Sequence, residues 1–411
     1  MRILTLSNLY PPHYVGGYEL RCGKVVEALR RRGHSVEVLT SNHGVGGDRP
    51  PAEDNSVNRS LRIHGFFGHP WLGIGELRGL ELHNNRILRD TLAASKPDLV
   101  HVWNLGGLSK SLCLTLQASG VPVVYDVSDH WIARSLVADV WLDWWNRPNP
   151  TVPARLARSW WNLSGARRRW NLIAPTNPVG DIHFPRVYFC SQALRDITAA
   201  KGYAVQHGAV IYCPVDTTLF HGETAPATRP LEKLLYVGRL SEDKGVMTAL
   251  QAMAGVKGRF AGHLNIYGKG DPEYTARLES FVREHGLPVF FKNAPAAEMP
   301  EVYRAHDALL FTSEWEEPFA LTPLEAMSSG LPVIGTTTGG SRELFRDGVN
   351  SLTYRAGSAP ELARCILDLA DNPGRRVQIA ATGHAEVRKN YADPVIIDQI
   401  EDYLRGSLPR S

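Results

Sequence analysis

Two carboxylates, Glu317 and Glu325, stand eight residues apart in the segment EWEEPFALTPLEAMSSGLPVIG, which begins at Glu314. The segment predicts a loop, a helix and a strand, because Thr322 can cap a helix that begins at Pro323, and Glu325 completes a capping box. Glu317 is then expected just ahead of the helix and Glu325 within its first turn, where both can bind hydroxyl groups of one ligand. In the plainer alternative Glu325 only closes the capping box and Glu317 is a solvated loop residue.

The start of this predicted helix favours a negatively charged ligand. The backbone amides around Phe319, Ala320 and Leu321 lie at the positive end of the helix dipole. We therefore expect an anion, such as a phosphate group, beside the two carboxylates.

A second loop supplies positive charge. In YVGRLSEDKG a strand that ends at Val237 is followed by Arg239 and Lys244 before the next helix begins. Two cations at this position can neutralise a diphosphate. A Walker loop, G-x-x-x-x-G-K-[ST], is absent, and the alternative is that both side chains are ordinary surface charges.

Two glycine-containing loops are further candidates for ligand contact. GKGD, from Gly268 to Asp271, follows a predicted strand and would permit close approach of a ligand to the backbone, although a turn is the plainer explanation. In YPPHYVGGYE, Gly16 and Gly17 stand at the start of a helix, where amides can meet a phosphate or a sugar. A tight turn is again the alternative.

These loops require an α/β scaffold to bring them together. RILTLS, at residues 2–7, precedes a helix from Tyr18 to Arg32 and the strand SVEVLTS, and such a crossover makes the two strands parallel. The same alternation recurs at DLVHVW, VPVVYDV and RVYFCS, and it restarts from Leu234 with LLYV, LNIYG, ALLFT and PVIGT. We expect two Rossmann-like, doubly wound domains facing each other across a cleft at the carboxyl ends of both sheets.

The length and a change in composition place the domain boundary. At 411 residues the chain exceeds what one hydrophobic core usually supports. Residues 212–230 are rich in Pro, Thr and Gly and lack both helical and strand periodicity. We therefore expect an N-terminal domain at 1–215 and a C-terminal domain that begins at residue 216.

Charge and cysteine content narrow the class of protein. The formal net charge of +3 is small for this length and does not indicate a nucleic-acid partner. The five cysteines are scattered and form no C-x-x-C pair, which favours a reducing compartment over a disulfide scaffold or a zinc site. The apolar start is too short for a signal peptide, and no apolar run of about eighteen residues follows. We expect a cytoplasmic protein.

In the order and spacing of GRLSEDKG, EPFALTPLEAMSSGLPVIG and GGSRELFRDGVNS, the chain resembles the retaining glycosyltransferases of family four, which have the GT-B fold. The resemblance covers nearly the whole chain, and Glu317 and Glu325 match the E-x7-E motif of that family. It implies an acceptor-side domain at 1–215, a nucleotide-sugar domain at 216–385, and a helix at 386–411 that crosses back to the N-terminal domain. It implies that Arg239 and Lys244 hold the diphosphate of a nucleotide-sugar donor. It also implies that Glu325 bonds the ribose, that Glu317 bonds the transferred sugar, and that Gly17 approaches the phosphate from the opposite domain.

Two positions depart from the family pattern. The amides of Phe319, Ala320 and Leu321 would line the donor pocket, but the family commonly has glycine where this chain has Ala320. The family often has a catalytic-site histidine after the strand that corresponds to VPVVYDV. The resemblance puts Ser128 at that position, with His130 two residues later.

The residues around Ser128 offer substitutes for the histidine. His130 would share a face with Ser128 on an extended segment and so supply the missing group, or it is an ordinary partly buried histidine. Asp126, Asp129 and Trp131 form D-x-x-D-x-W, which resembles one branch of these transferases in which other polar groups occupy the histidine position. We therefore count Asp129 and His130 among the catalytic candidates.

The resemblance implies retention of anomeric configuration in transfer from a UDP- or GDP-sugar to a glycan, lipid-linked or small-molecule acceptor. Departure of the nucleoside diphosphate builds negative charge, which Arg239, Lys244 and the helix N-terminus can stabilise. The sequence has no D-x-D motif in a strand-end loop and no histidine cluster, so we expect neither metal nor cofactor. The rival functions are a non-catalytic nucleotide-sugar-binding or scaffold subunit and a nucleotide-sugar epimerase of similar fold. The motifs leave the oligomeric state open.

One part of the N-terminal domain is unusual in composition. The segment at residues 131–182 contains seven of the ten tryptophans, interleaved with arginines. Leu156, Trp160 and Leu163 have helical spacing, so we expect an insertion packed on the domain with its arginines in water. The alternatives are a wall of the acceptor site, or peripheral docking on the anionic inner face of a membrane.

Overall fold

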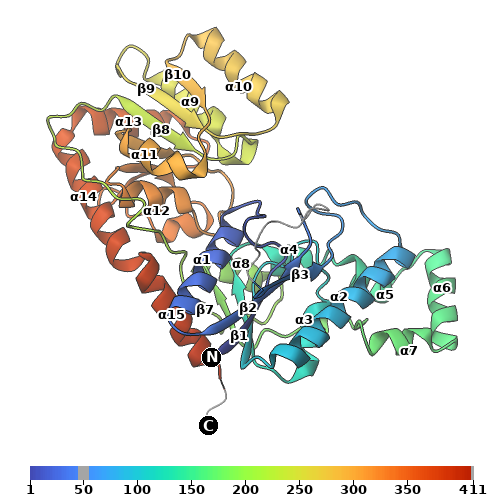
Figure 1. The fold of residues 1–411 in the computed structure, drawn as a ribbon. Coiled ribbons are helices and arrows are strands. Elements are labelled where there is room, and N and C mark those ends of the chain that lie inside the picture. Colours follow the sequence, from blue (N-terminus) through green and yellow to red (C-terminus); the bar gives the residue numbers. More distant parts are fainter. Residues whose placement is uncertain (45–54, 409–411) are drawn as a thin grey trace. The chain divides into compact units, whose positions relative to one another are not determined.

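The computed structural model describes residues 1–44 and 55–408, which form two compact α/β units (Figure 1). The last three residues of the helix expected at 386–411 lie outside the described residues. Unit 1 contains the described residues of Met1–Cys190, Leu194–Ile211 and the segment from Ile397 onward, whereas unit 2 contains Ser191–Ala193 and Tyr212–Ile396.

Unit 1 is built on a parallel sheet with the strand order β3-β2-β1-β4-β5-β6-β7 in the described part of the chain. The chain runs outward from β1 to one edge and then returns to β4 on the other side, which is the switch point of a doubly wound sheet. Every residue of β4 and β5 is buried, as expected for a parallel sheet covered on both faces. The strands are β1 (Arg2–Leu6), β2 (Ser35–Ser41), β3 (Val57–Leu61), β4 (Leu99–Val102), β5 (Val123–Val127), β6 (Val187–Phe189) and β7 (Ala209–Val210).

The helices of unit 1 pack their apolar stripes on this sheet. In α1 the buried residues Cys22, Val25, Val26 and Leu29 recur at helical spacing. The α-helices in the described residues are α1 (Gly17–Arg31), α2 (Ile74–Ser95), α3 (Ser111–Ser119), α4 (Trp131–Ser135), α5 (Val140–Asn146), α6 (Val152–Leu163) and α7 (Ala166–Asn171), together with the part of α8 (Gln192–Ala200) from Leu194 onward and the part of α15 (Asp393–Arg405) that follows Ile396. This last part is held in unit 1 by Tyr403, whose hydroxyl donates to the Val187 carbonyl at 2.9 Å.

Unit 2 contains a second parallel sheet, with the strand order β10-β9-β8-β11-β12-β13. Its strands are β8 (Lys233–Val237), β9 (His263–Tyr267), β10 (Val289–Lys292), β11 (Ala308–Phe311), β12 (Val333–Thr336) and β13 (Leu352–Tyr354). Its helices are α9 (Val246–Gly255), α10 (Pro272–His285), α11 (Met299–Arg304), α12 (Leu321–Ser328), α13 (Ala359–Asp371), α14 (Pro373–Asn390) and the start of α15.

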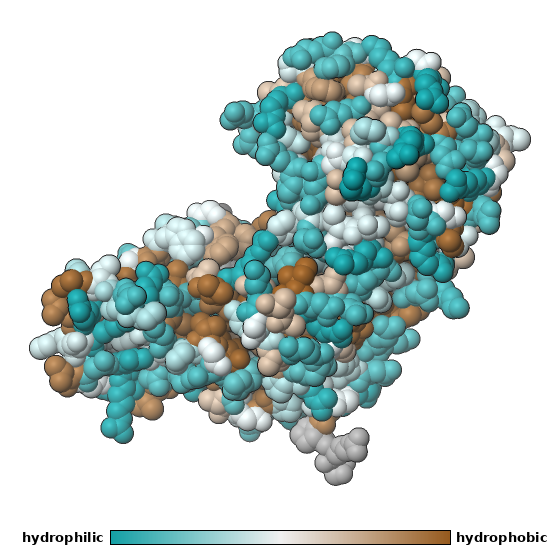
Figure 2. All heavy atoms as spheres, turned by 180° about the vertical axis from the view of Figure 1, so that it is seen from behind, coloured by the Kyte–Doolittle hydropathy of each residue, from teal (hydrophilic) through white to brown (hydrophobic). Residues whose placement is uncertain are grey.

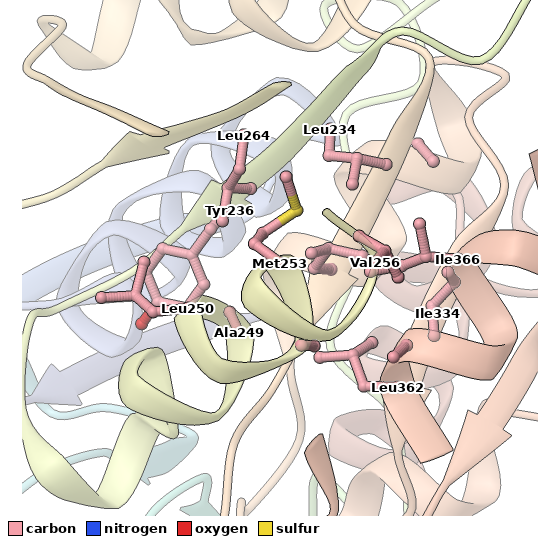
Figure 3. Close-up of a cluster of buried hydrophobic side chains, with 14 of the residues drawn as sticks. Leu234, Tyr236, Ala249, Leu250, Met253, Val256, Leu264, Ile334, Leu362 and Ile366 are labelled. Carbon is pink, nitrogen blue, oxygen red and sulfur yellow. The ribbon is translucent and has the colours of Figure 1, made fainter. Parts of the chain in front are cut away.

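An apolar cluster packs helices of unit 2, α9 and α13 among them, on its sheet (Figure 3). Leu234 of β8 and Leu264 of β9 meet Met253 of α9 and Ile366 of α13, and all four side chains are at most 1% exposed. Burial of this apolar surface is the main force that fixes α9 and α13 on the sheet. Because α9 follows β8 directly, the same packing determines where the β8–α9 loop lies.

The predicted α/β fold with two doubly wound Rossmann-like domains is confirmed. Four strands are missing from the prediction, and each of them lies at an edge of its sheet: β3 and β7 in unit 1, and β10 and β13 in unit 2. An edge strand is short and partly exposed, so it lacks the continuous apolar run that identifies a central strand. The two-residue β7 shows this most clearly.

The prediction that Leu156, Trp160 and Leu163 pack on the domain is wrong. All three side chains face solvent on α6, with exposed fractions of 66%, 69% and 87%. The opposite face of α6 makes the contact instead, through Trp161, whose ring lies 5.2 Å from that of Trp144. Helical spacing shows which residues share a face, but it does not show which face meets the protein. In the described part of the chain, no helix combines the length and the apolarity that crossing a membrane requires.

A carboxyl group lies in the core of unit 1, at Glu81 on α2. Its side chain is fully buried, and the Ser111 hydroxyl donates to its Oε2 at 3.0 Å. Burial, together with the negative charge of Asp139, raises the pKa of Glu81 to about 8. Glu81 is therefore largely protonated at neutral pH in the folded protein.

This carboxyl group makes the stability of the protein depend on pH. Between the ordinary glutamate pKa and about 8, folded Glu81 binds a proton that the unfolded chain releases, so stability falls as the pH rises through this window. The free energy of unfolding of the wild type should fall by an amount on the order of 2–4 kcal/mol between pH 6 and 9, and the Glu81→Gln variant should not show this fall. Thermal and urea unfolding across this range measure it, with Glu27→Gln, an exposed glutamate of α1, as the matched control. Equal pH slopes for wild type and Glu81→Gln would contradict the assignment.

Candidate functional site

The loop after β8 is anchored to the end of β11, and this contact positions Lys244. The Thr312 hydroxyl donates to the Lys244 carbonyl at 2.7 Å. Gly245 follows with φ of +62°, and a Cβ there would lie 2.0 Å from the Thr312 carbonyl oxygen. Glycine is therefore required for the two loops to approach this closely.

Lys244 forms an ion pair with Glu317 at the carboxyl edge of the sheet. The Lys244 Nζ donates to Glu317 Oε1 at 2.5 Å, and the Ser313 hydroxyl donates to the same oxygen at 2.6 Å. The two charged side chains are only 17% and 12% exposed. Among the described residues no group donates to Glu317 Oε2. One carboxylate oxygen thus holds the lysine, and the other remains available to a ligand.

The backbone beside Glu317 is supported by a pair of glycines after β12. The Gly340 amide donates to the Glu317 carbonyl at 2.6 Å. A Cβ on Gly340 would lie 2.1 Å from the Pro318 carbonyl oxygen, so a larger residue would displace this loop. Gly340 belongs to the GGSRELFRDGVNS segment, whose spacing alone does not show this supporting contact.

Arg239 lies in the same β8–α9 loop but is exposed. Its carbonyl accepts a hydrogen bond from the Tyr236 hydroxyl at 2.9 Å, which holds the backbone while the guanidinium extends into solvent. Among residues 1–44 and 55–408 no carboxylate lies within ion-pair distance of Arg239. Its five N–H donors are therefore available to an anionic ligand.

The predicted capping box at Thr322 and Glu325 is wrong. Helix α12 begins at Leu321, its N-cap residue is Ala320, and no side chain caps it. Glu325 is the fifth residue of α12 rather than part of its first turn, and its Oε2 accepts from the Tyr303 hydroxyl at 2.7 Å. Proline is tolerated throughout the first turn of a helix, so Pro323 does not specify which residue comes first.

The start of α12 nevertheless retains the donors expected for an anion site. Within the described residues, the backbone N–H groups of Ala320, Leu321 and Thr322 donate to no protein acceptor. Unsatisfied amides at a helix N-terminus bind anions readily. Two of these three amides, those of Ala320 and Leu321, are among the amides predicted to bind an anion, so the anion site stays a prediction although its predicted cap is wrong.

Phe319 and Ala320 point their side chains into unit 2 rather than toward a ligand. They are 7% and 5% exposed, and the Phe319 ring lies 5.1 Å from the ring of Tyr212 and 5.9 Å from that of Tyr391. These aromatic contacts anchor the loop that leads into α12. The two residues can meet a ligand through their backbone only.

The packing of two loops explains why residue 268 is a glycine. A Cβ there would lie 1.9 Å from the Gly238 carbonyl oxygen, and the Leu240 amide donates to the Lys269 carbonyl at 2.9 Å. The loops after β8 and β9 therefore pack directly on each other. Close approach of one backbone to another explains this glycine without a ligand.

In unit 1, Gly16 and Gly17 do stand at the start of a helix, with Gly16 as the N-cap of α1. The Gly16 amide donates to Glu19 Oε2 at 2.9 Å, so a carboxylate of the chain already occupies part of this positive helix end. Glu19 is absent from the predicted site. The G-x-x-E spacing of a capping box is the signal that could have revealed it.

A buried ion pair that the sequence analysis missed supports the loop after β5. Arg21 on α1 and Asp126 are 2.9 Å apart, with side chains 4% and 0% exposed. The Ser128 hydroxyl donates to Asp126 Oδ1 at 2.8 Å, and Arg21 also contacts Ser128. The Tyr18 hydroxyl donates to the Asp126 carbonyl at 2.5 Å. Ser128, at the position of the family histidine, thus belongs to a charged network.

The idea that His130 shares a face with Ser128 along an extended segment is wrong. Strand β5 ends at Val127, the chain bends, and His130 is the N-cap of α4 with φ of −80° and ψ of 23°. The alternation of a strand does not apply there. The His130 side chain is 8% exposed.

Asp129 occupies the same bend and is partly buried. Its Oδ1 accepts from the Trp131 amide at 2.8 Å and its Oδ2 from the Asn104 side chain at 3.2 Å. Removal from water raises the pKa of Asp129 to about 6. At neutral pH it is therefore a carboxylate that gains a proton more readily than an ordinary aspartate.

The predicted site residues thus form two groups in different units. Unit 2 brings Lys244 and Glu317 into direct contact, while the Arg239 side chain is exposed and Glu325 accepts from Tyr303. Unit 1 places Asp129 and His130 in one turn. In the part of the chain that the structure describes, no three His, Cys, Asp or Glu side chains are grouped as metal ligands.

Two protein-family models match the chain in order along its length. The model of the glycosyl transferase 4-like domain matches residues 16–179, and that of glycosyl transferases group 1 matches residues 225–385. An uncharacterized glycosyltransferase of Methanocaldococcus jannaschii is 23% identical, over 95% of this chain and 95% of its own. The glycogen synthase of Mycobacterium tuberculosis is 26% identical, over 91% of this chain and 87% of its own.

Solved structures agree on the fold. The crystal structure of Anabaena HepE in complex with UDP has a TM-score of 0.68 at 20% identity and covers 99% of this chain and 100% of its own. The sucrose-phosphate synthase of Thermosynechococcus elongatus has a TM-score of 0.69 at 19% identity, and covers 99% of both chains. With both domain models matched in order and a GT-B fold, the protein belongs to the group 1 glycosyltransferases, and its pair of domains is consistent with family four.

Proposed function

We propose that this glycosyltransferase moves a sugar from a UDP- or GDP-sugar to a glycan, lipid-linked or small-molecule acceptor, with retention of anomeric configuration. The observation that carries the proposal is the Lys244–Glu317 ion pair at the carboxyl edge of unit 2. In this pair Lys244 can bind a phosphate, and Glu317 can accept hydrogen bonds from sugar hydroxyls. The solved complexes of HepE with UDP and with UDP-glucose support a donor of this class.

The positive groups of unit 2 would act on the leaving nucleoside diphosphate. Departure of the diphosphate concentrates negative charge on its bridging oxygen, and preorganised donors stabilise that charge more than they stabilise the ground state. Lys244, Arg239 and the amides at the start of α12 are such donors. The proposed reaction relies on this positive charge, with no metal or cofactor required.

The two glutamates of the E-x7-E motif would bind different parts of the donor. Glu317 accepts hydrogen bonds from the transferred sugar through its Oε2. Glu325, oriented by the Tyr303 hydroxyl, accepts from the ribose. Carboxylates suit both roles, because charge-assisted hydrogen bonds to hydroxyl groups are stronger than neutral ones.

The turn after β5 would act on the acceptor. In a retaining reaction without a covalent intermediate, the departing phosphate accepts the proton of the acceptor hydroxyl as the new glycosidic bond forms on the same face. Asp129 and His130 would orient that hydroxyl, and Gly17, at the start of α1, would offer its amide to a phosphate oxygen, whereas the Gly16 amide is engaged by Glu19. We also propose that the enzyme works in the cytoplasm, which suits its five free cysteines.

A donor screen tests the proposal. We expect one or a few UDP- or GDP-sugars to raise the thermal midpoint, because a ligand present at about a hundred times its Kd stabilises the folded state by about 2.7 kcal/mol. Transfer with that donor should then give a product whose anomeric coupling, measured by NMR, matches that of the donor. The proposal fails if no nucleotide sugar binds, and an inverted product would refute retention alone.

A further inference from the structure

Helix α6 exposes a continuous apolar stripe, formed by Val152, Leu156, Trp160 and Leu163. Their exposed fractions are 59%, 66%, 69% and 87%, and their spacing places them on one side of the helix. Leu172, directly after α7, is 73% exposed as well. Figure 1 shows α6 and α7 at one end of unit 1, and Figure 2 shows brown, apolar side chains at that end. Contiguous exposed apolar surface of this kind marks an interaction site.

The side of α6 opposite the stripe packs against other tryptophan side chains of unit 1. On the opposite side of α6, the Trp161 ring lies 5.2 Å from Trp144, 5.7 Å from Trp145 and 5.1 Å from Trp170. The guanidinium of Arg158 lies 5.3 Å from the centre of the Trp144 ring. Aromatic and cation–π contacts therefore fix the helix with its apolar side outward.

The segment that carries the stripe is strongly basic. Between Trp144 and Gly180 the chain has six arginines and no aspartate, glutamate or lysine, although the whole protein has a net charge of only +3. The rest of the chain therefore carries a formal charge of −3. Arg155, Arg168 and Arg169 are exposed. Positive charge is thus concentrated beside the apolar stripe, where it attracts an anionic partner.

A hollow of about 360 Å³ lies between the two helices of this segment. Arg167, Arg168, Asn162, Asn171 and Thr176 line it. Arg167 donates to the Thr176 hydroxyl at 3.1 Å, so one guanidinium is held in place. Arginine and amide donors around an open hollow suit a phosphate group.

We propose that α6 and α7 dock the enzyme on an anionic phospholipid surface. The stripe enters the boundary between headgroups and acyl chains, and the arginines bind lipid phosphates. Leucine and tryptophan on one side of a helix with arginine beside them are the composition of interfacial helices. The basic segment adds attraction to anionic lipids in particular. This inference does not depend on the identity of the sugar donor.

The charge distribution disfavours other occupants of the stripe. In a symmetric dimer each stripe would face its copy, and the arginines of both copies would meet at one interface. A nucleic acid would use the arginines but would leave the valine and leucine side chains in water. A bilayer satisfies both features, because it offers phosphates next to an apolar layer.

Co-sedimentation of the full chain with phospholipid vesicles tests the proposal. We expect binding to vesicles that contain phosphatidylglycerol, weaker binding to pure phosphatidylcholine, and a decrease with added salt. The double variant Leu156→Ser with Trp160→Ser should lower the partition coefficient at least about tenfold. The matched control is Phe290→Ser with Val349→Ser, which removes side chains of unit 2 that are 51% and 45% exposed.

A second pair of variants separates charge from apolarity. Arg168→Gln with Arg169→Gln should weaken binding to anionic vesicles only, whereas Arg259→Gln with Arg283→Gln, two exposed arginines of unit 2, should not. Thermal midpoints show whether each variant folds. The proposal is overturned if the folded wild type ignores anionic vesicles. It is also overturned if α6 variants abolish self-association measured by ultracentrifugation without lipid, which would assign the stripe to a second copy.

Discussion

Replacement of Lys244 by methionine is expected to weaken the binding of UDP or GDP about a hundredfold, and replacement of Arg239 about tenfold to a hundredfold. The effect at Lys244 has two parts. The phosphate loses an ammonium partner. The Glu317 carboxylate also loses the lysine that lies 2.5 Å from it in the wild type, so its unpaired negative charge repels the incoming anion. Arg239 is exposed and forms no ion pair with a carboxylate among the described residues, so its replacement exposes no negative charge and should cost less affinity. Isothermal titration calorimetry with each nucleotide measures both values.

The control and a double variant make this test specific. Lys257→Met removes the same charge just beyond the other end of α9, where Lys257 donates to the His285 carbonyl, and it should leave affinity unchanged. Adding Glu317→Gln to Lys244→Met should restore part of the lost affinity, because it removes the unpaired carboxylate. If both Lys244→Met and Arg239→Met bind UDP and GDP as the wild type does, the proposed donor site is wrong.

The second large effect is expected at Glu317, where glutamine should lower kcat/KM for transfer about a hundredfold to a thousandfold. The amide is nearly the same size but cannot carry the charge that strengthens hydrogen bonds to sugar hydroxyls. Binding of the nucleoside diphosphate alone should change less than about tenfold, because Lys244 remains. Steady-state kinetics measure kcat/KM for transfer, and calorimetry measures the affinity for the nucleoside diphosphate.

Glu316→Gln provides the matched control for this change. Glu316 is the preceding residue, its side chain is 58% exposed, and its carboxylate lies 3.7 Å from Arg342. Loss of this exposed contact should alter neither transfer nor binding appreciably. A Glu317→Gln enzyme that transfers sugar at the wild-type rate would remove Glu317 from the site, whatever its effect on stability.

The sequence located candidate residues in loops that directly follow strands, but it misplaced a feature that depends on fine backbone geometry. Lys244 and Glu317 were identified from loops that follow predicted strands, and the structure brings them together. The cap at Thr322 was wrong, because serine, threonine and proline fit several positions of a first turn and the sequence does not choose among them. Whether these residues bind a donor stays a prediction.

The sequence by itself determined the alternation of strands and helices, the order of the motifs and the types of residue in each strand-end loop. These features follow from local rules: residue periodicity, β-propensity, and glycine or proline at the ends of elements. The four edge strands were not predicted, because partial exposure weakens the pattern of apolar residues that identifies a strand.

Only the tertiary structure decided which of these residues meet. Lys244 and Glu317 are 73 positions apart, and they touch because β8 lies beside β11 in the sheet. Arg21 and Asp126 are 105 positions apart, and they meet because the fold packs α1 beside the end of β5. The side of α6 that faces water was decided by the packing of Trp161. Contacts between distant segments depend on strand order and on competition for buried volume, and neither quantity is encoded in a local stretch of sequence.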